Sequence, residues 1–185
     1  KLDWLNGYYI RQLSTNELTR RIIPFLIKDG LISDDFSTQG AVPVGRQGPA
    51  AGWEYIKKVV LLEQSRLKKL NEIGERGAYF FKNPEYQPEL LVWRDMLFKD
   101  IAVSLHVSLK ALSIINDSDF NRENLEKIFI KESERAKNKD KGRLLWPLRV
   151  ALTGLEKSPG PFEILEILGK KESLKRIEKA IKKLV

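Results

Sequence analysis

The chain has 185 residues, 42% hydrophobic and 31% charged, which suffices for a buried core in one large or two small domains. It has no cysteine, which excludes disulfides and thiolate metal sites, and no apolar run approaches the roughly 18 residues that a membrane-spanning helix needs. The net charge of +8 favours a polyanionic partner such as RNA.

The start of the sequence bears on the compartment of the protein. No signal-peptide pattern opens the chain, and the lack of cysteine fits the cytosol, so we expect a cytoplasmic protein that does not enter a membrane. The first residue is Lys1 and the only methionine is Met96. We therefore expect a fragment or a trimmed chain.

Two helices are predicted at the N-terminus. Apolar residues recur at helical spacing over residues 2–12. Ser14 and Glu17 form a capping box for a second helix that reaches about Lys28 and contains Pro24.

The aromatic residues of the first helix have two interpretations. Trp4 would pack at the junction of the two helices, with Tyr8 and Tyr9 as further core residues. If the same rings are exposed, they can stack on RNA bases. The sequence leaves both interpretations open.

Residues 30–52 are predicted to form a long loop, since they include five glycines and two prolines. Gly40 and Gly45 have the spacing of a phosphate-binding loop. However, the Lys-Ser/Thr pair is missing and no strand precedes the glycines, so we exclude that function.

A third helix is predicted from about Trp53 to Ile73, and it carries two charges inside its apolar face. Glu63 and Arg66 both fall within this arc. A charge on a buried face needs a partner or a purpose. Either the two residues form an i,i+3 ion pair at the edge of the core, or packing holds Arg66 so that its planar head faces a ligand, where it can hydrogen-bond or stack on a base.

The middle of the chain predicts further helices and no metal site. His106 has no second histidine and no paired carboxylate at ligand spacing, so it is interpreted as a boundary residue. The predicted elements are a short helix over 75–81, an extended or turn segment over 89–93, a strong helix over 98–116, and a helix capped by Asp119 or Asn121 that ends in the charged stretch 131–141.

Residues 142–169 predict a helix, a turn and a second helix. Pro147 falls a turn into the first helix, where its missing N–H costs least, and Gly154 can close that helix in a left-handed conformation. Pro161 suits the first position of the next helix. The lysine-rich C-terminal helix that follows is either a solvated face or a surface for a polyanion.

Three segments of this sequence carry a more specific signal than composition and helical spacing alone provide. They are KLDWLNGYYIRQLS at the N-terminus, LLEQSRLKKLNEIGERGAYFF in the middle, and PLRVALTG followed by SPGPFEILEILGKKESLKRIEKAI at the C-terminus. In this order they resemble the part of bacterial glutamyl-tRNA synthetases that follows the catalytic core. The resemblance implies an all-α helical bundle or cage, with stem-contact-like helices and a linker at 1–52 and anticodon-binding subdomains at 53–141 and 142–185.

The resemblance also implies roles for individual residues. The family arginine that matches Arg66 contacts the first anticodon base, position 34, and helps to distinguish a glutamate from a glutamine anticodon. Around the other anticodon bases the family places residues that match Arg149 and the turn Ser158, Pro159, Gly160 and Pro161. Contacts to the tRNA backbone or stem fall to Lys1, Trp4 and Lys69. Where the family often has Thr-Pro-Gly-Leu, this chain has Ser-Pro-Gly-Pro, which removes one backbone N–H at Pro161.

The partner implied by the resemblance is glutamate tRNA, with charging of glutamine tRNA left open, and the expected state is a monomer. ATP and magnesium belong to the parent enzyme, and the chain contains neither His-x-Gly-His nor a Lys-Met-Ser-Lys-Ser-type loop. We therefore expect no cofactor and no aminoacylation by this chain alone. Two rivals remain: a basic helical protein-interaction module without nucleic-acid specificity, and a helical DNA-binding domain, which is disfavoured because the C-terminal helix lacks Asn and Gln.

Overall fold

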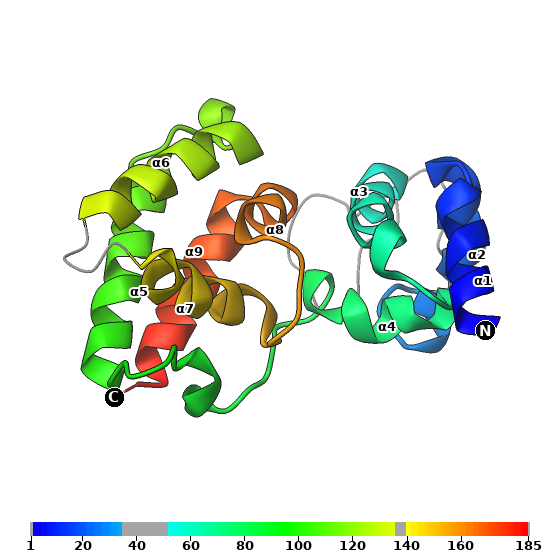
Figure 1. Ribbon diagram of the computed structural model, residues 1–185. Coiled ribbons are helices and arrows are strands. Elements are labelled where there is room, and N and C mark those ends of the chain that lie inside the picture. Colours follow the sequence, from blue (N-terminus) through cyan, green and yellow to red (C-terminus); the bar gives the residue numbers. More distant parts are fainter. Residues whose placement is uncertain (1, 35–51, 136–139, 185) are drawn as a thin grey trace. The chain divides into compact units, whose positions relative to one another are not determined.

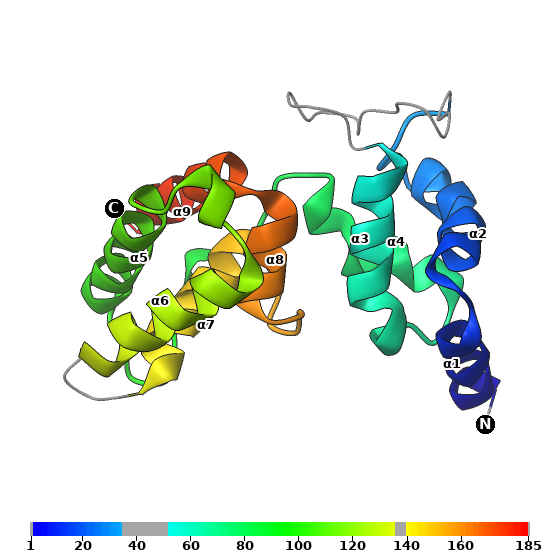
Figure 2. The ribbon, with the colours of Figure 1, turned by 90° about the horizontal axis from the view of Figure 1, so that it is seen from above.

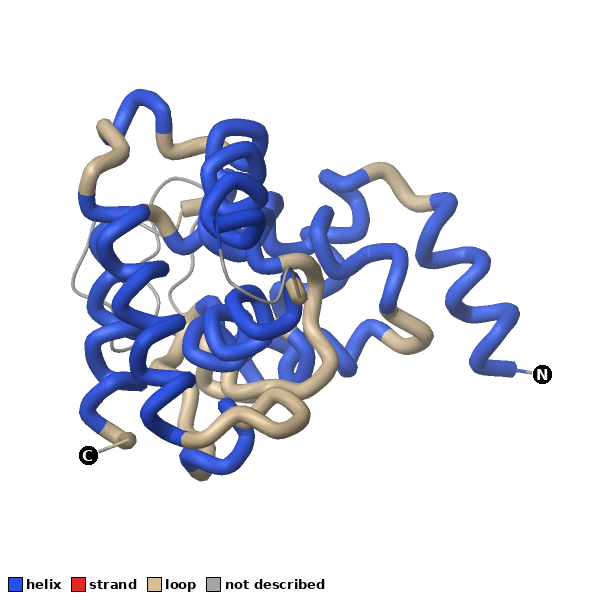
Figure 3. Tube along the Cα trace, turned by 60° about the vertical axis from the view of Figure 1, so that its left-hand side comes forward, coloured by secondary structure: helices blue, strands red, loops and turns tan. Residues whose placement is uncertain are grey.

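The computed structural model describes residues 2–34, 52–135 and 140–184. Within these ranges the chain forms α-helices, short 3-10 helices and loops, and it forms no strand (Figures 1 and 3). The predicted all-α class is therefore confirmed.

The chain divides into two compact units, Lys1–Asn83 and Pro84–Val185. The sequence placed boundaries after residues 52 and 141 instead. Helix packing accounts for the difference. The helix Trp53–Glu63 packs on the helix Thr15–Lys28, and the helix Lys141–Thr153 packs on the helix Phe98–Ser113.

The described residues of the first unit form the α-helices α1 (Leu2–Gln12), α2 (Thr15–Lys28), α3 (Trp53–Glu63) and α4 (Ile73–Arg76), together with 3-10 turns at Gln64–Arg66, Leu70–Glu72 and Ala78–Phe80. Helix α2 packs against α3 and α4 (Figure 2). The fully buried side chains of the first unit include Leu18, Ile22, Leu26, Ile56, Val60, Leu67, Ile73 and Phe80.

Both N-terminal helices form where the sequence predicted them. Helix α1 has the predicted bounds, and α2 follows Ser14, whose side-chain oxygen accepts a hydrogen bond from the Glu17 N–H at 3.3 Å. This contact satisfies one of the free donors in the first turn of α2.

The long helix predicted from Trp53 to Ile73 is wrong. Helix α3 ends at Glu63, a single 3-10 turn follows, and Leu67 is extended with ψ of 132°. The break places the Leu67 side chain in the core, where it is fully buried. The short helix predicted over 75–81 is also replaced, by α4 and the 3-10 turn Ala78–Phe80.

In the second unit, the part of the chain that the structure describes forms the α-helices α5 (Phe98–Ser113), α6 (Arg122–Arg135), α7 (Lys141–Thr153), α8 (Pro161–Leu168) and α9 (Lys170–Lys182), with 3-10 turns at Pro88–Leu91 and Asp117–Asp119. Helix α5 lies along α9 and α7, and α6 packs on α8 (Figure 1). The core side chains include Leu105, Leu112, Leu125, Phe129, Leu148, Leu152, Ile164, Leu165 and Ile177.

Caps and turns of the second unit follow the sequence, with one exception. The Asn121 side chain accepts from the Asn124 N–H at 3.1 Å, and Gly154 ends α7 with φ of 68°. Pro161 opens α8 as predicted. Pro147, however, lies in the interior of α7 beyond its first turn, so its ring removes a helical N–H that would otherwise bond to Arg143.

Candidate nucleic-acid interface

Arg66 lies in the 3-10 turn after α3 and contacts a buried carboxylate. Its Nε is 3.2 Å from Oε2 of Glu63; the Glu63 side chain is 1% exposed and that of Arg66 is 29% exposed. These two atoms are themselves buried and misaligned for a hydrogen bond, and among the described residues they have no other hydrogen-bond partner. Because Nε is buried, the exposed part of Arg66 is elsewhere on its side chain.

The carboxylate of Glu63 is held from its other side by Tyr79. The tyrosine hydroxyl donates to Oε1 at 3.1 Å, within the core of the first unit. Burial raises the pKa of the Glu63 carboxyl, and the nearby Arg66 charge acts in the opposite direction. Burial and the same carboxylate also raise the pKa of Tyr79, so its hydroxyl keeps its proton and remains a donor.

The turn that carries Arg66 is fastened to α1. The Gln64 side-chain amide donates to the backbone carbonyls of Ile10 and Leu13, at 3.0 and 2.9 Å, near the C-terminal end of that helix. A Cβ added to Gly7 would lie 3.1 Å from Nη1 of Arg11 and 3.3 Å from the Leu67 carbonyl oxygen, so glycine eases the close approach of α1 to this turn. The backbone on both sides of Arg66 is thus fixed.

The aromatic residues of α1 are exposed, so the prediction that they belong to the core is wrong. Trp4 is 71% exposed, Tyr8 46% and Tyr9 61%. The Trp4 and Tyr8 rings stack with centroids 6.2 Å apart, and Tyr9 meets Tyr8 edge to face. This row of rings is available for stacking, as the second interpretation of these residues required.

Of the predicted stem contacts, Lys69 lies beside this row and Lys1 lies outside the described residues. The Lys69 Nζ pairs with Asp3 Oδ1 at 3.2 Å, and both side chains are about half exposed. An exposed pair of this kind contributes little to stability, so Lys69 can exchange Asp3 for an anionic ligand at small cost.

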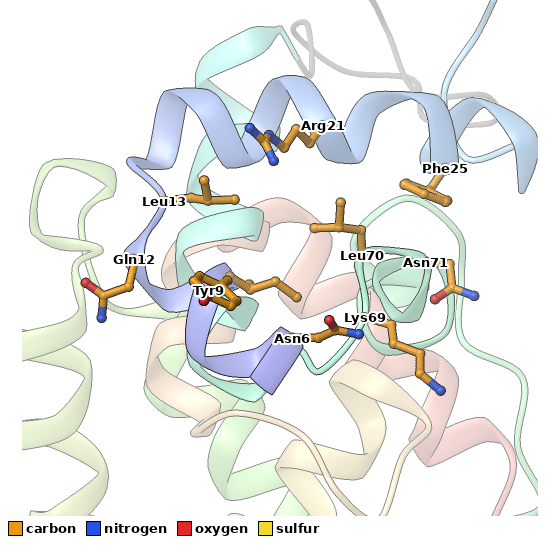
Figure 4. A pocket seen from close by; sticks show the side chains of 10 residues that line it. Asn6, Tyr9, Gln12, Leu13, Arg21, Phe25, Lys69, Leu70 and Asn71 are labelled. Carbon is orange, nitrogen blue, oxygen red and sulfur yellow. The ribbon is translucent and has the colours of Figure 1, made fainter. Parts of the chain in front are cut away.

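A hollow of about 600 Å³ lies between α1, α2 and the 69–71 segment (Figure 4). Most of its lining surface is apolar, although half of the lining residues are polar or charged, among them Lys69 and Arg21. Arg21 is engaged by Glu17 at 2.8 Å, as Lys69 is by Asp3. The full lining is Asn6, Tyr9, Ile10, Gln12, Leu13, Arg21, Phe25, Lys69, Leu70 and Asn71.

In the second unit, Arg149 lies on α7 against an indole. Its guanidinium carbon is 4.7 Å from the centre of the Trp146 ring, and its Nη2 donates to the Glu156 carbonyl at 2.9 Å. Trp146 in turn packs on Trp93 with centroids 5.1 Å apart, and Arg94 covers the Trp93 ring at 5.2 Å. Two guanidinium groups and two indoles are thus joined by a series of pairwise contacts.

Neither Trp93 nor Arg94 was singled out from the sequence, because they lie far from Trp146 along the chain and share no helical period with it. Asp140 joins the two segments: it accepts from Trp93 Nε1 at 3.1 Å and caps α7 through the Gly142 N–H at 2.9 Å. The indole N–H and this backbone N–H hold the pKa of Asp140 below its usual range.

The predicted turn from Ser158 to Pro161 presents only part of itself to solvent. Ser158 and Pro159 are buried, whereas Gly160 is exposed and Pro161 half-buried. Gly160 is the N-cap of α8, and Glu163 in the first turn pairs with Arg122 at 3.2 Å. The exposed backbone here is therefore centred on Gly160.

The lysine-rich α9 divides into structural and exposed cations. Arg176 is buried, donating to Glu172 at 2.9 Å and to the Leu152 carbonyl at 2.6 Å. Lys170 donates to the carbonyls of Ser113 and Ile115 after α5. The exposed cations of this helix are Lys171, Lys175, Lys179 and Lys182.

Side chains that could ligate a metal ion are scattered in the described ranges. These ranges contain no group of three or more His, Cys, Asp or Glu side chains placed to hold a metal ion. His106 contacts the Ala102 carbonyl of its own helix at 2.7 Å. None of the helices in the described parts of the chain combines the length and apolarity of a membrane span.

An all-α fold with exposed arginine, lysine and aromatic side chains is compatible with a helical nucleic-acid-binding domain, and a family model identifies the family. The model described as an anticodon binding domain matches residues 17–181. The chain therefore belongs to the anticodon-binding domain family.

Sequence relatives confirm the resemblance to bacterial glutamyl-tRNA synthetases. The chain is 34% identical over 182 residues to glutamate–tRNA ligase 1 of Caldanaerobacter subterraneus subsp. tengcongensis, covering 98% of the chain and 34% of the relative. It is 33% identical over 187 residues to glutamate–tRNA ligase of Clostridium tetani, covering 100% of the chain and again 34% of the relative. The chain thus spans about a third of the length of these relatives.

A solved structure has the same fold. The crystal structure of a glutamate tRNA ligase from Elizabethkingia meningosepticum, in complex with its amino acid, matches 99% of this chain and 32% of its own length. The TM-score is 0.75 at 24% sequence identity. The helical architecture predicted from the resemblance is therefore confirmed.

Proposed function

We propose that this chain binds the anticodon loop of tRNA as one part of a glutamate–tRNA ligase, which charges glutamate tRNA in the cytoplasm. The observation that carries the proposal is the anticodon-binding family match across residues 17–181. The relatives are about three times as long as the matched region, so charging is a property we assign to the whole ligase. We expect the 185-residue chain to be a monomer that is inactive alone.

The same comparisons decide between the rival functions. Every relative reported above is a glutamate–tRNA ligase, which supports a tRNA-binding function over a protein-interaction module. ATP and magnesium would act elsewhere in such a ligase, since the described residues offer no acidic cluster for a metal ion.

The chemistry of Arg66 favours cytosine as its ligand. A guanidinium is a fork of donors and cannot act as an acceptor. Cytosine is the only one of the four RNA bases whose Watson–Crick edge has two adjacent acceptors, O2 and N3; uracil and guanine interpose an N–H donor. A fork directed at this edge therefore pairs with cytosine and leaves a donor facing a donor on the others.

The two roles that the family resemblance gives Arg66 place it at different anticodon positions. Glutamate and glutamine anticodons share their first two bases and differ in the third, cytosine against guanine. An arginine that separates these tRNAs must act on the third base, position 36, whereas a contact at position 34 distinguishes tRNAs of the same amino acid. Contact at position 34 stays a prediction, and the experiment below varies both positions.

Other residues would supply affinity without reading this base. We assign Arg149 and the exposed backbone at Gly160 to the neighbouring anticodon bases, and the α1 rings to stacking on RNA. The exposed lysines of α9 would contact phosphates, so binding should weaken steeply as salt is raised. Glutamate tRNA is the proposed partner, and the same experiment tests glutamine tRNA.

The test is a binding titration of this chain with anticodon stem-loops of glutamate tRNA. Loops with cytosine or uracil at position 34, and with cytosine or guanine at position 36, are compared at two salt concentrations. Arg66→Lys keeps the charge but loses the fork, and we expect it to cost about 1–3 kcal/mol of binding to the preferred loop only. Arg20→Lys, an exposed arginine on α2, is the matched control.

Wild type should prefer one base at position 34 or at position 36. If Arg66→Lys loses the preference at one of these positions, Arg66 reads the base there. An equal loss for all loops would remove the base-reading role of Arg66. Salt-insensitive binding, or none at low salt, would contradict the proposed function itself.

A further inference from the structure

We propose that Glu63 is a positioning residue that sets the direction of the Arg66 fork and thereby determines base specificity, with Tyr79 holding Glu63 in place. This inference rests on the proposed anticodon-reading function. The three side chains form a chain of contacts from the core outward, Tyr79 to Glu63 at 3.1 Å and Glu63 to Arg66 at 3.2 Å.

Stability alone does not account for a carboxylate at this position. Glu63 is fully buried among the core residues of the first unit. Desolvation of a buried ion pair can outweigh the attraction between its charges, and an apolar residue of similar volume often does as well. The carboxylate is therefore better explained by what it does to Arg66 than by what it adds to the core.

The ion pair restricts the Arg66 side chain before RNA arrives. Arginine has a long side chain whose rotamer freedom would otherwise be lost on binding. Nε is buried against Glu63 while 29% of the Arg66 side chain is exposed, so we infer that the Nη end of the guanidinium is the part that faces solvent. The backbone is held as well, because Gln64 is bonded to the end of α1 and Leu67 is buried in the core.

Direction matters because an arginine that can turn freely has an alternative ligand on guanine. Guanine offers O6 and N7 as a pair of acceptors on another edge, and a bidentate arginine contact to this pair is common in nucleic-acid recognition. A fork whose direction is fixed can reject guanine, while the same fork released from Glu63 can rotate to accept it. We therefore expect Glu63 to affect the difference in binding affinity between cytosine and guanine, and to affect the overall affinity for RNA much less.

The experiment measures stem-loop binding for wild type and Glu63→Gln, with cytosine or guanine at position 36 and cytosine or uracil at position 34. Glu54→Gln is the matched control. It lies on the same helix and pairs with Lys57 at the same i,i+3 spacing and 3.2 Å, but its side chain is 73% exposed.

We expect Glu63→Gln to remain folded, to bind the preferred loop within a few-fold of wild type, and to lose about tenfold in discrimination. Glu54→Gln should discriminate as wild type does. Tyr79→Phe, which removes the hydroxyl that holds Glu63, should shift discrimination in the same direction by less. If Glu63→Gln unfolds, Tyr79→Phe decides in its place.

A second readout needs no RNA. The Nε–H resonance of Arg66, identified by its loss in Arg66→Lys, should exchange slowly with solvent in wild type and rapidly in Glu63→Gln. If wild type discriminates between the bases, and Glu63→Gln and Tyr79→Phe discriminate equally well, the inference is overturned while the proposed function stands. Failure of wild type to discriminate any base would instead overturn the base-reading function and the inference with it, even if the resonance behaves as expected.

Discussion

Two arginines assigned to the same loop of RNA are supported in different ways by the two units. Arg66 in the first unit has its Nε against the fully buried carboxylate of Glu63. Arg149 in the second unit lies on the Trp146 ring and donates to the carbonyl of Glu156, an exposed residue. One support is a buried charge, and the other includes an aromatic face and a backbone oxygen that water can reach.

The difference determines what each arginine does for folding. Glu63 depends on Arg66 for compensation of its charge, so we expect Arg66 to affect the stability of the first unit as well as its proposed role in recognition. The Glu156 carbonyl can be hydrated when Arg149 is absent, and Trp146 keeps its contact with Trp93. Binding and stability should therefore be coupled at Arg66 and nearly separate at Arg149.

The largest expected effect is on the stability of the first unit. Arg66→Met leaves the charge of Glu63 buried without the cation that it contacts. We expect the free energy of unfolding, measured by urea titration, to fall by about 3–5 kcal/mol. The double variant Glu63→Gln with Arg66→Met removes the charge too and should recover most of the loss. A double variant as unstable as the single one would show that lost packing, not the charge, is responsible.

The same variant should depend on pH in a defined direction. Burial raises the pKa of Glu63 above its ordinary value of 4.5, and removing Arg66 removes a group that lowers it. A carboxyl with a raised pKa in the folded state is stabilising when protonated, and that stability is lost as pH rises through the folded pKa. The penalty of Arg66→Met should be greatest near pH 8 and shrink toward pH 5, as measured by thermal unfolding; a penalty constant across this range would contradict the mechanism.

Much of the local structure was predictable because its signals are short-range. The bounds of α1, the Ser14 cap, the left-handed Gly154 and the start of α8 at Pro161 each depend on neighbouring residues. The i,i+3 pairing of Glu63 with Arg66 was also one of the two interpretations of the sequence, and the contact is present.

The remaining features depend on tertiary contacts that no local period contains. The helix break after Glu63 follows from burying Leu67 in the core, although a helical wheel continues through it. Exposure of Trp4 could not be predicted either, because an amphipathic pattern does not say whether a large ring has a partner. The Trp93–Trp146 contact joins segments too distant in sequence for any spacing rule.

A smaller effect on stability is expected in the second unit, where Gly142 lies close to the Trp93 ring. A Cβ added at Gly142 would lie 2.4 Å from Cε2 of Trp93, so Gly142→Ala should displace that ring and cost about 1–3 kcal/mol. Tryptophan fluorescence would report the movement, and calorimetry the cost. Gly52→Ala, whose added Cβ would meet no atom of the described residues within 4 Å, is the control; an equal loss in both would exclude the indole clash as the cause.

The smallest effect should come from Arg149, and it completes the contrast with Arg66. Arg149→Met gives up a cation–π contact and a hydrogen bond to a solvent-accessible carbonyl, so we expect about 1 kcal/mol of stability to be lost. Anticodon stem-loop affinity should fall with little change in melting temperature. A stability loss as large as that of Arg66→Met would mean that the second unit also depends on its arginine for folding, and the separation of binding from stability would fail.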